Sequence, residues 1–276
     1  MKPVSQSEIA SYSTIRIEGV YADCSTSVGT GFFFAFHWDQ KTNKSNPVII
    51  TNKHVIENTD SGKLVFTIAD KNGNPLDGKQ YIANITPFAS QWKYHPNPNI
   101  DLCALPITGI VLDAQSKGVK LAYKMMDFSM LPTASDIEKM TAMEDVVIVG
   151  YPDGIWDEVN NRPVFRKGIT ATHYAFNYNG NKEFLIDASI FPGSSGSPVF
   201  ILNEGIIQDK FGKIELAKSR ALLLGVVYKV FQHSVDGAIV IQNIPTSQVP
   251  ISKSYIPNNI GLVIKSSELL ALEALF

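Results

Sequence analysis

Short runs of β-branched and aromatic residues recur along the chain, with turn-forming residues between them. Such runs are found at Thr14–Val20, Gly31–Trp38, Val48–Thr51, Leu64–Ala69, Val146–Gly150, Phe184–Ala188, Pro198–Leu202, Leu222–Val230 and Ala238–Gln242. Runs of this length and composition are typical of strands. Turn signals such as Lys71–Asn74 and Asn179–Asn181 lie between several of them. Many short strands at fairly regular spacing predict an all-β sandwich or barrel fold.

Helical signals lie near the two ends of the chain. Ser5–Glu8 has the form of a capping box, which predicts a short N-terminal helix. The leucines of Ser267–Phe276 predict a C-terminal helix that packs one face on the body. Between about Asp113 and Glu144 the strand pattern fades, and we interpret this stretch as the connection between two β-domains. The predicted division is therefore 10–115, 116–144, 145–265 and 266–276.

Composition and charge indicate an ordinary globular protein. The chain has 276 residues, of which 45% are hydrophobic and 18% are charged, a balance far from that of disordered chains. The formal net charge is -2 and the basic residues are scattered, so nothing suggests a nucleic-acid or acidic-membrane partner. No apolar run approaches the roughly 18 residues of a membrane span.

Cysteine usage and the N-terminal residues bear on the compartment. The two cysteines, Cys24 and Cys103, lie in apolar stretches and are interpreted as buried thiols in a reducing environment. The first residues contain no apolar segment of the kind found in signal peptides. We therefore expect a cytoplasmic protein.

The segment Gly193–Pro198 has the composition expected around a nucleophilic serine. Ser195 lies two residues after Gly193, whose backbone freedom allows its N–H to point at a developing oxyanion. The alternative is a plain turn between two strands, because short motifs have high false-positive rates. Ser194 and Ser197 are alternative hydroxyls, and position favours Ser195.

A nucleophilic serine needs a base, and the base needs a carboxylate that orients it. His54 follows the apolar strand Val48–Thr51, and a strand end is where a rigid scaffold presents a side chain. Asp101 stands where a loop enters an apolar run. Taken alone, each has a simpler interpretation, the histidine as a polar strand tip and the aspartate as a turn residue. The other histidines are His37, His95, His173 and His233.

Three segments together resemble the signature blocks of trypsin-like serine peptidases. They are Thr51–Ile56, Asn99–Leu105 and Gly193–Pro198, which carry His54, Asp101 and Ser195 in the order that this family uses. Minor blocks at Gly29–Phe33 and Val149–Pro152 agree, and the resemblance extends from about residue 10 to residue 265. It is strongest to the bacterial HtrA-like and V8-like branches, without the PDZ domain that HtrA-like enzymes add.

The resemblance implies a fold, an activity and a site. We expect two antiparallel six-stranded β-barrels with a cleft between them, and a serine endopeptidase that acts on a protein or peptide substrate. His54, Asp101 and Ser195 form the expected triad, and the backbone N–H groups of Gly193, Ser194 and Ser195 form the expected oxyanion hole. No metal or cofactor is expected. Because Ser194 replaces the aspartate of proteolytically activated relatives, we expect no activating cleavage.

The same resemblance suggests how the pocket for the substrate's P1 residue is built. Ser189 is expected at its base, with Tyr228 and Val230 as walls. Since Ser189 carries no charge to pair with Lys or Arg, an uncharged P1 residue of small or medium size is predicted.

The main alternative is a peptidase-fold chain that has lost catalysis and serves as a binding module. The presence of all three triad members together with Gly193 favours the enzyme. A regulatory protein partner is left open by the sequence.

Overall fold

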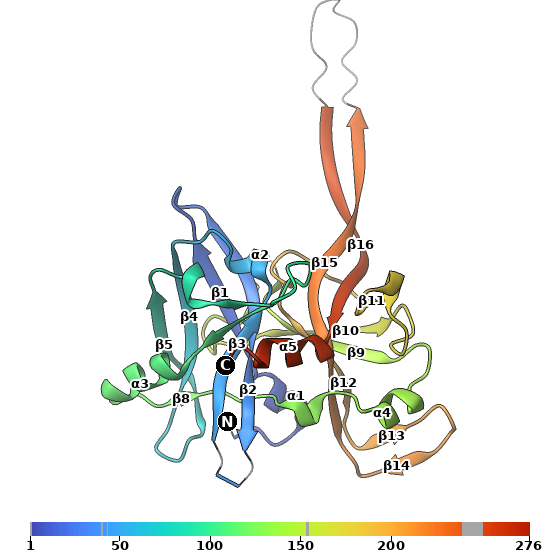
Figure 1. Cartoon of the computed structure of the whole chain (residues 1–276), viewed down its shortest axis with the longest axis horizontal. Coiled ribbons are helices and arrows are strands. Elements are labelled where there is room, and N and C mark those ends of the chain that lie inside the picture. Colours follow the sequence, from blue (N-terminus) through green and yellow to red (C-terminus); the bar gives the residue numbers. More distant parts are fainter. Residues whose placement is uncertain (1, 40, 43, 153–154, 239–250) are drawn as a thin grey trace, which may run out of the picture.

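The computed structural model describes residues 2–39, 41–42, 44–152, 155–238 and 251–276. Two antiparallel strand systems lie side by side, one from each half of the chain (Figure 1). The strands of the first are β1 (Thr14–Val20), β2 (Thr26–Asp39), β3 (Lys44–Thr51), β4 (Ser61–Ala69), β5 (Pro75–Ile85), β6 (Lys93–Tyr94), β7 (Cys103–Pro106) and β8 (Leu121–Ala122). They form a sheet in the order β5-β4-β1-β2-β3-β7-β6, with β8 paired to β4.

The second half forms the closed barrel that the sequence predicts. Its ladder runs β10-β11-β16-β15-β12-β9 and returns to β10. The strands are β9 (Asp145–Gly150), β10 (Val164–Thr170), β11 (Glu183–Asp187), β12 (Pro198–Asn203), β15 (Arg220–Ala238) and β16 (Ile251–Lys265). A separate hairpin of β13 (Ile206–Gln208) and β14 (Ile214–Leu216) extends from it.

Closure of the first half into a six-stranded barrel is not confirmed. Within the described residues its ladder is an open path that ends at β5 and β6, and β6 has only two residues. The segment between these strands buries Phe88 and Trp92 against the sheet, with the Phe88 ring over Gly62 of β4. Both side chains belong to the internal cluster of the first half.

Strand β2 is buried on both faces, which explains why its sequence is almost continuously apolar. Phe32, Phe34 and Phe36 face a buried cluster that lies between the two halves. Phe33, which points to the opposite face, belongs to the internal cluster of the first half. A strand buried on both faces needs apolar residues at successive positions rather than at alternate ones.

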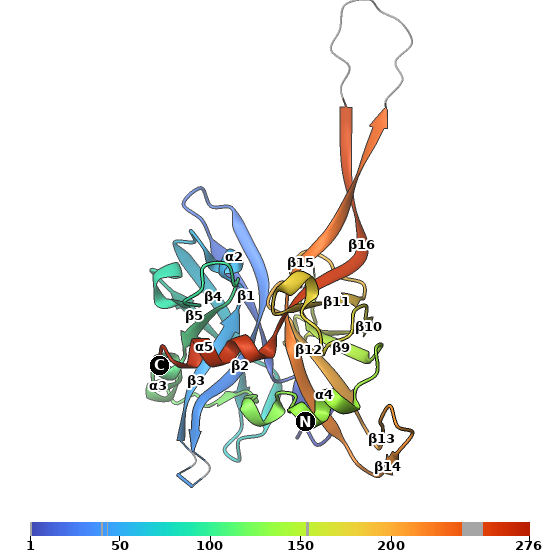
Figure 2. The same cartoon turned by 45° about the vertical axis from the view of Figure 1, so that its right-hand side comes forward.

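The cluster between the halves draws on both of them and on the C-terminal helix. Val149, Phe200 and Leu223 come from the barrel, and Leu269 and Leu272 from α5 (Leu269–Glu273). Figure 2 shows α5 lying across the junction of the two strand systems. Burial of this apolar surface holds the halves in a fixed relation, which positions the site at their boundary.

Helices occur in more places than the sequence pattern indicates. The N-terminal helix α1 (Gln6–Ala10) has the predicted capping box between Ser5 and Glu8. Two further helices lie mid-chain, α3 (Thr108–Ser116) and α4 (Ala134–Lys139), and α3 crosses the boundary predicted at residue 115. Helix α4 has a capping box between Thr133 and Asp136, within the stretch interpreted as the connection between the two β-domains. No helix in the described ranges is long and apolar enough to cross a membrane.

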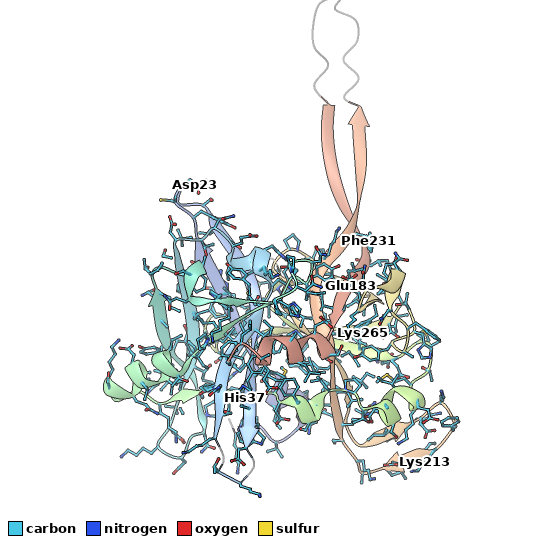
Figure 3. The ribbon with its side chains drawn as sticks, viewed as in Figure 1. Asp23, His37, Glu183, Lys213, Phe231 and Lys265 are labelled. Carbon is cyan, nitrogen blue, oxygen red and sulfur yellow. The ribbon has the colours of Figure 1, made fainter. Side chains whose placement is uncertain are left out.

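Strands β15 and β16 continue beyond the barrel as a two-stranded ribbon (Figure 1). The pairing extends to Ala238 opposite Ile251, with register shifts after Val227 and Val230. Figure 3 labels Phe231 near the base of this ribbon and Lys213 on the β13–β14 hairpin at the opposite end of the barrel. Of the predicted strand Ala238–Gln242, residues 239–242 lie outside the described residues.

Candidate active site

His54 is presented by a single helical turn that directly follows a buried strand. β3 ends at Thr51, and α2 (Lys53–Ile56) begins after Asn52. The Asn52 side chain is fully buried and donates from Nδ2 to the backbone oxygen of Asp101 at 2.7 Å. This bond joins the His54 turn to the Asp101 loop and so fixes the positions of the two segments relative to each other.

Asp101 lies in the loop between β6 and β7, and its carboxylate contacts His54 twice. Oδ1 accepts from the backbone N–H of His54 at 3.2 Å, and Oδ2 lies 2.5 Å from His54 Nδ1. Because an ionised carboxylate only accepts hydrogen bonds, Nδ1 carries the proton in this contact. The imidazole is thereby held in one orientation and one tautomer, with Nε2 left as an acceptor.

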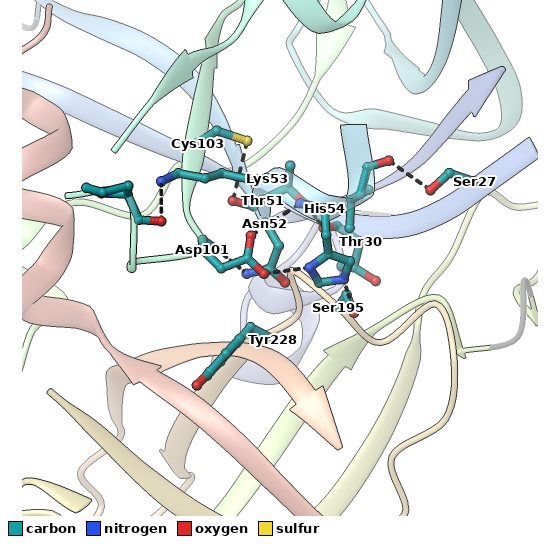
Figure 4. A network of polar contacts seen from close by, with 12 residues as sticks. Ser27, Thr30, Thr51, Asn52, Lys53, His54, Asp101, Cys103, Ser195 and Tyr228 are labelled. Atoms are coloured by element: carbon teal, nitrogen blue, oxygen red, sulfur yellow. Dashed lines mark hydrogen bonds and ion pairs between the residues drawn. The ribbon is translucent and has the colours of Figure 1, made fainter. Parts of the chain in front are cut away.

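Ser195 lies on the other side of the imidazole. The distance from His54 Nε2 to Ser195 Oγ is 2.9 Å (Figure 4). The side chains of His54 and Asp101 are 47% and 23% exposed, so the pair stands at the surface of the boundary between the halves. The structure therefore brings together the three residues that the sequence singled out, from three separate segments.

The turn that carries Ser195 depends on two glycines with positive φ, Gly193 at 82° and Gly196 at 83°. Gly196 is also crowded, since a Cβ there would lie 1.9 Å from the backbone oxygen of Thr30. Its N–H donates to the oxygen of Val227 at 2.8 Å, which ties the turn to β15.

Thr30 of β2 links this turn to the first half of the chain. Its N–H donates to the oxygen of Ser195 at 2.9 Å, and its Oγ1 donates to the oxygen of Gly193 at 3.0 Å. Thr30 Oγ1 also accepts from the N–H of Tyr151 at 3.0 Å, and the Thr30 oxygen accepts from Thr51 Oγ1 at 2.7 Å. Thr30 is fully buried. One residue, through its backbone and its side chain, thus relates the serine turn to the strand that precedes His54.

Two backbone donors beside Ser195 have no acceptor within the described part of the chain, the N–H groups of Gly193 and Ser195. Such donors suit an oxyanion. The structure departs from the expected set at Ser194, whose N–H donates to the oxygen of Phe191 at 3.1 Å and is therefore occupied. The Ser194 side chain is fully buried under the turn.

Arg166 of β10 contacts this same segment, and sequence reasoning missed it. Its Nη2 donates to Ser194 Oγ at 2.8 Å, and its Nη1 donates to the backbone oxygen of Ser189. Ser194 Oγ also accepts from the N–H of Phe191 at 3.3 Å. Nothing in the local sequence around Arg166 distinguishes it from a solvent-facing residue of a strand.

A pocket of about 260 Å³ opens beside Ser195. It is lined by Ile190, Phe191, Pro192, Ser195, Val227, Tyr228, Lys229 and Val230. Two of the residues expected to form the P1 pocket, Tyr228 and Val230, are among them.

Ser189, the third expected pocket residue, is exposed and does not line this pocket. Ile190 lines it instead and packs against Gly261, where a Cβ would lie 2.0 Å from Ile190 Cδ1. Tyr228 donates its hydroxyl to Glu183 Oε1 at 2.8 Å, and burial together with this bond raises the pKa of the Tyr228 hydroxyl.

Comparison with known families gives one match that covers most of the chain. The model of the trypsin-like peptidase domain matches residues 29–206. The chain belongs to this family. The match includes His54, Asp101 and Ser195 and covers well over half of the chain. No curated protein sequence matches this trypsin-like peptidase.

Solved structures to which this chain is similar include three proteases. An HtrA-type protease, AlgW with a tripeptide, is 19% identical, with 97% of this chain and 60% of that chain covered and a TM-score of 0.47. A serine endoprotease from Yersinia pestis is 16% identical, with 98% and 65% covered and a TM-score of 0.46. A protease from M. tuberculosis in its active form is 15% identical, with 99% and 87% covered and a TM-score of 0.45. The peptidase thus spans less than two thirds of the first two chains.

The remaining histidines with described side chains lie in other contacts. His95 is buried, with Nε2 3.5 Å from Glu268 Oε2, and His37 Nδ1 lies 3.5 Å from Glu273 Oε1. His173 stacks edge-on against Phe176. The side chain of His233 lies outside the described residues.

Among the side chains that the structure describes, no group of three or more His, Cys, Asp or Glu residues could hold a metal ion. The described residues of the site supply a nucleophile, a base, a carboxylate and backbone donors. Groups of these kinds are the ones that serine-dependent acyl transfer uses.

Proposed function

We propose that this trypsin-like peptidase is a serine endopeptidase with His54, Asp101 and Ser195 as its catalytic triad. The observation that carries the proposal is the continuous chain of contacts Asp101–His54–Ser195, at 2.5 Å and 2.9 Å. A nucleophile bonded to a base, which is in turn oriented by a carboxylate, is the arrangement that activates a serine.

The proposed reaction follows from the tautomer of His54, in which Nδ1 carries the proton and Nε2 is free to accept one. Ser195 Oγ attacks a peptide carbonyl while His54 Nε2 accepts its proton, and the same nitrogen returns the proton to the leaving amine. Asp101 holds Nδ1–H and stabilises the imidazolium that forms. The charge on the former carbonyl oxygen is bound by the N–H groups of Gly193 and Ser195. Water then hydrolyses the acyl-enzyme by the same steps in reverse.

We further propose that the substrate is a protein or peptide with an uncharged P1 side chain. The pocket beside Ser195 has apolar walls from Ile190, Val227 and Val230 and no carboxylate in its described lining. A Lys or Arg side chain would lose hydration there without gaining a counter-charge. Lys229 also lines the pocket but is exposed, so water screens its attraction for an acidic side chain. The cytoplasmic location and a regulatory partner stay predictions.

The test is labelling with a fluorophosphonate, followed by peptide mapping and assays on peptides with Val, Lys or Glu at P1. We expect Ser195 to be modified, and Ser195→Ala to lose activity on the order of 10⁶-fold in kcat. Ser197→Ala is the matched control, because Ser197 is buried in the same turn and its hydroxyl has no partner among the described residues. Cleavage confined to Lys or Glu at P1 would overturn the proposed pocket.

The second candidate function is a binding module that keeps the fold without catalysis. It is favoured only by the exposure of the triad, which any surface site would share. A wild-type protein that is neither labelled nor active on any of the three peptides, while folded by circular dichroism, would support this function and refute the endopeptidase.

A further inference from the structure

The closed barrel has an irregular place beside the serine turn. β10 pairs with β9 from Val164 to Ile169, but it pairs with β11 only at Ile169 and Thr170. Beyond Asp187, which faces Ile169, the chain leaves the ladder and forms the segment 188–194 that leads to Ser195. The loop begins with one backbone bond to β16, from the Ala188 N–H to the Asn259 oxygen at 2.9 Å. Along the rest of this stretch β10 has a loop as its neighbour, and no ladder pairing joins the two within the described residues.

Arg166 bridges this irregular place with its side chain. Its guanidinium reaches the backbone oxygen of Ser189 with Nη1 and the hydroxyl of Ser194 with Nη2, the latter at 2.8 Å. A guanidinium is planar and rigid, so two bonds from one group fix the distance and the orientation between the acceptors. Ser194 passes this restraint on, because its Oγ also accepts from the N–H of Phe191 at 3.3 Å.

The segment between the two acceptors contributes to both parts of the proposed site. Ile190, Phe191 and Pro192 line the pocket beside Ser195. Gly193, with its positive φ of 82°, carries one of the two N–H groups without an acceptor among the described residues. A movement of the segment would therefore disturb the pocket and the oxyanion donors together, while leaving the His54–Asp101 contact in place.

We propose that Arg166 is a positioning residue that holds the segment Ser189–Ser194 in the conformation that directs the Gly193 N–H at the oxyanion. The catalytic part of this inference rests on the endopeptidase function proposed above. Arg166 touches neither His54 nor Asp101 in any described contact, so it acts on the oxyanion donors and the pocket rather than on the base.

The substitution Arg166→Met removes the donors and keeps most of the side-chain volume, and Arg166→Lys keeps the charge but not the two-pronged geometry. Lys167→Met is the matched control. Lys167 is the next residue of β10, is 69% exposed, and pairs with Asp145 at 2.7 Å on the outside of the barrel. Thermal unfolding of all three variants identifies any that fail to fold.

The first measurement is hydrogen–deuterium exchange of peptides that cover residues 189–196, which does not depend on activity. We expect exchange at least about tenfold faster in Arg166→Met, an intermediate rate in Arg166→Lys, and the wild-type rate in Lys167→Met. Unchanged exchange in a folded Arg166→Met protein would overturn the proposal.

The second measurement is the rate of fluorophosphonate labelling as a function of pH. In Arg166→Met we expect the maximal labelling rate, reached on the plateau of the pH profile, to fall about 10- to 100-fold. The midpoint that reports His54 should stay where it is in the wild type, because the His54–Asp101 contact is untouched. A shifted pH midpoint would mean that Arg166 acts through His54. An unchanged maximal labelling rate would show that Arg166 does not affect the oxyanion donors. Faster exchange in Arg166→Met combined with an inert wild type would refute the endopeptidase function and the catalytic part of this inference, leaving Arg166 as a structural link.

Discussion

Replacing Gly196 with alanine tests whether the serine turn depends on close backbone contact with the first half of the chain. Gly196 has φ of 83°, and a Cβ there would lie 1.9 Å from the Thr30 oxygen and 2.4 Å from Thr51 Oγ1. Real contacts of this kind do not fall below 3.0 Å, so the Thr30 carbonyl and the turn must separate by about 1 Å.

The expected cost has a conformational part and a contact part. Holding alanine in the left-handed region costs roughly 1–2 kcal/mol. The separation also breaks or stretches the bonds from Thr51 Oγ1 to the Thr30 oxygen and from the Thr30 N–H to the Ser195 oxygen. At about 0.5–1.5 kcal/mol for each buried bond, the free energy of unfolding should fall by about 2–5 kcal/mol in total.

Gly205→Ala and Gly212→Ala are matched controls for the conformational part. Both glycines have similar φ angles, 88° and 83°, and a Cβ at either would have no atom within 4 Å. Urea unfolding of these variants should show a loss of only about 1–2 kcal/mol. The difference between Gly196→Ala and these controls then measures the crowding alone.

The rate of labelling by the fluorophosphonate should also fall more in Gly196→Ala than in Gly205→Ala or Gly212→Ala. A displacement of about 1 Å between Ser195 and His54 costs on the order of 100-fold in rate, so Gly196→Ala should label at least that much more slowly than either control. Equal losses of stability in the three variants, or wild-type labelling of Gly196→Ala, would refute the argument that this close approach positions Ser195.

Two further predictions concern parts of the molecule away from the triad. Asn161, at φ of 55°, donates from its buried Nδ2 to the Val65 oxygen at 3.1 Å and to Thr67 Oγ1 at 3.2 Å, and so joins the segment after β9 to β4. Asn161→Ala should lower the free energy of unfolding, measured in urea, by about 1–3 kcal/mol. The control Asn179→Ala, at φ of 50° on an exposed turn, should lower it by less. Equal losses in the two variants would contradict the stabilising link between Asn161 and β4. The expectation of two buried thiols is wrong for Cys24, which is exposed, and holds for Cys103. Burial raises the pKa of the Cys103 thiol well above its ordinary value, so iodoacetamide at pH 8 should modify Cys24 in the native protein and both thiols only after unfolding, as counted by mass spectrometry. Modification of native Cys103 would show that its burial is wrong.

The residues with reactive side chains could be found from the sequence because each stands in a recognisable local setting. His54 follows an apolar strand, Asp101 precedes one, and Ser195 lies in a glycine-flanked turn. Those settings are encoded within a few residues, and the structure brings the three side chains into contact. The closed second barrel was predictable only in part. Apolar runs indicated β9, β11, β12 and much of β15, but not β10 or β16, and closure was expected from the family resemblance.

Features set by contacts distant in the sequence were not predictable from local patterns. The first sheet stays an open path, and the segment between its end strands buries Phe88 and Trp92, whose burial no strand pattern reports. The P1 pocket was assigned to Ser189, but the chain leaves the β11 ladder at Asp187, and Ile190 turns inward because Gly261 leaves room for it. A position inferred from a family resemblance does not detect such a change of direction.

Thr30 and Arg166 contact the serine turn from strands outside it. The turn at Gly193–Gly196 is bonded in this way to both halves of the chain. Thr30 holds it from a strand 163 residues away in the sequence from Gly193, and Arg166 holds it from a strand 28 residues from Ser194. Threonine and arginine are common in strands, and their local sequence does not show that these two side chains contact the serine turn. Residues that perform chemistry can therefore be recognised by motif, whereas residues that position them are identified by the contacts of the folded chain.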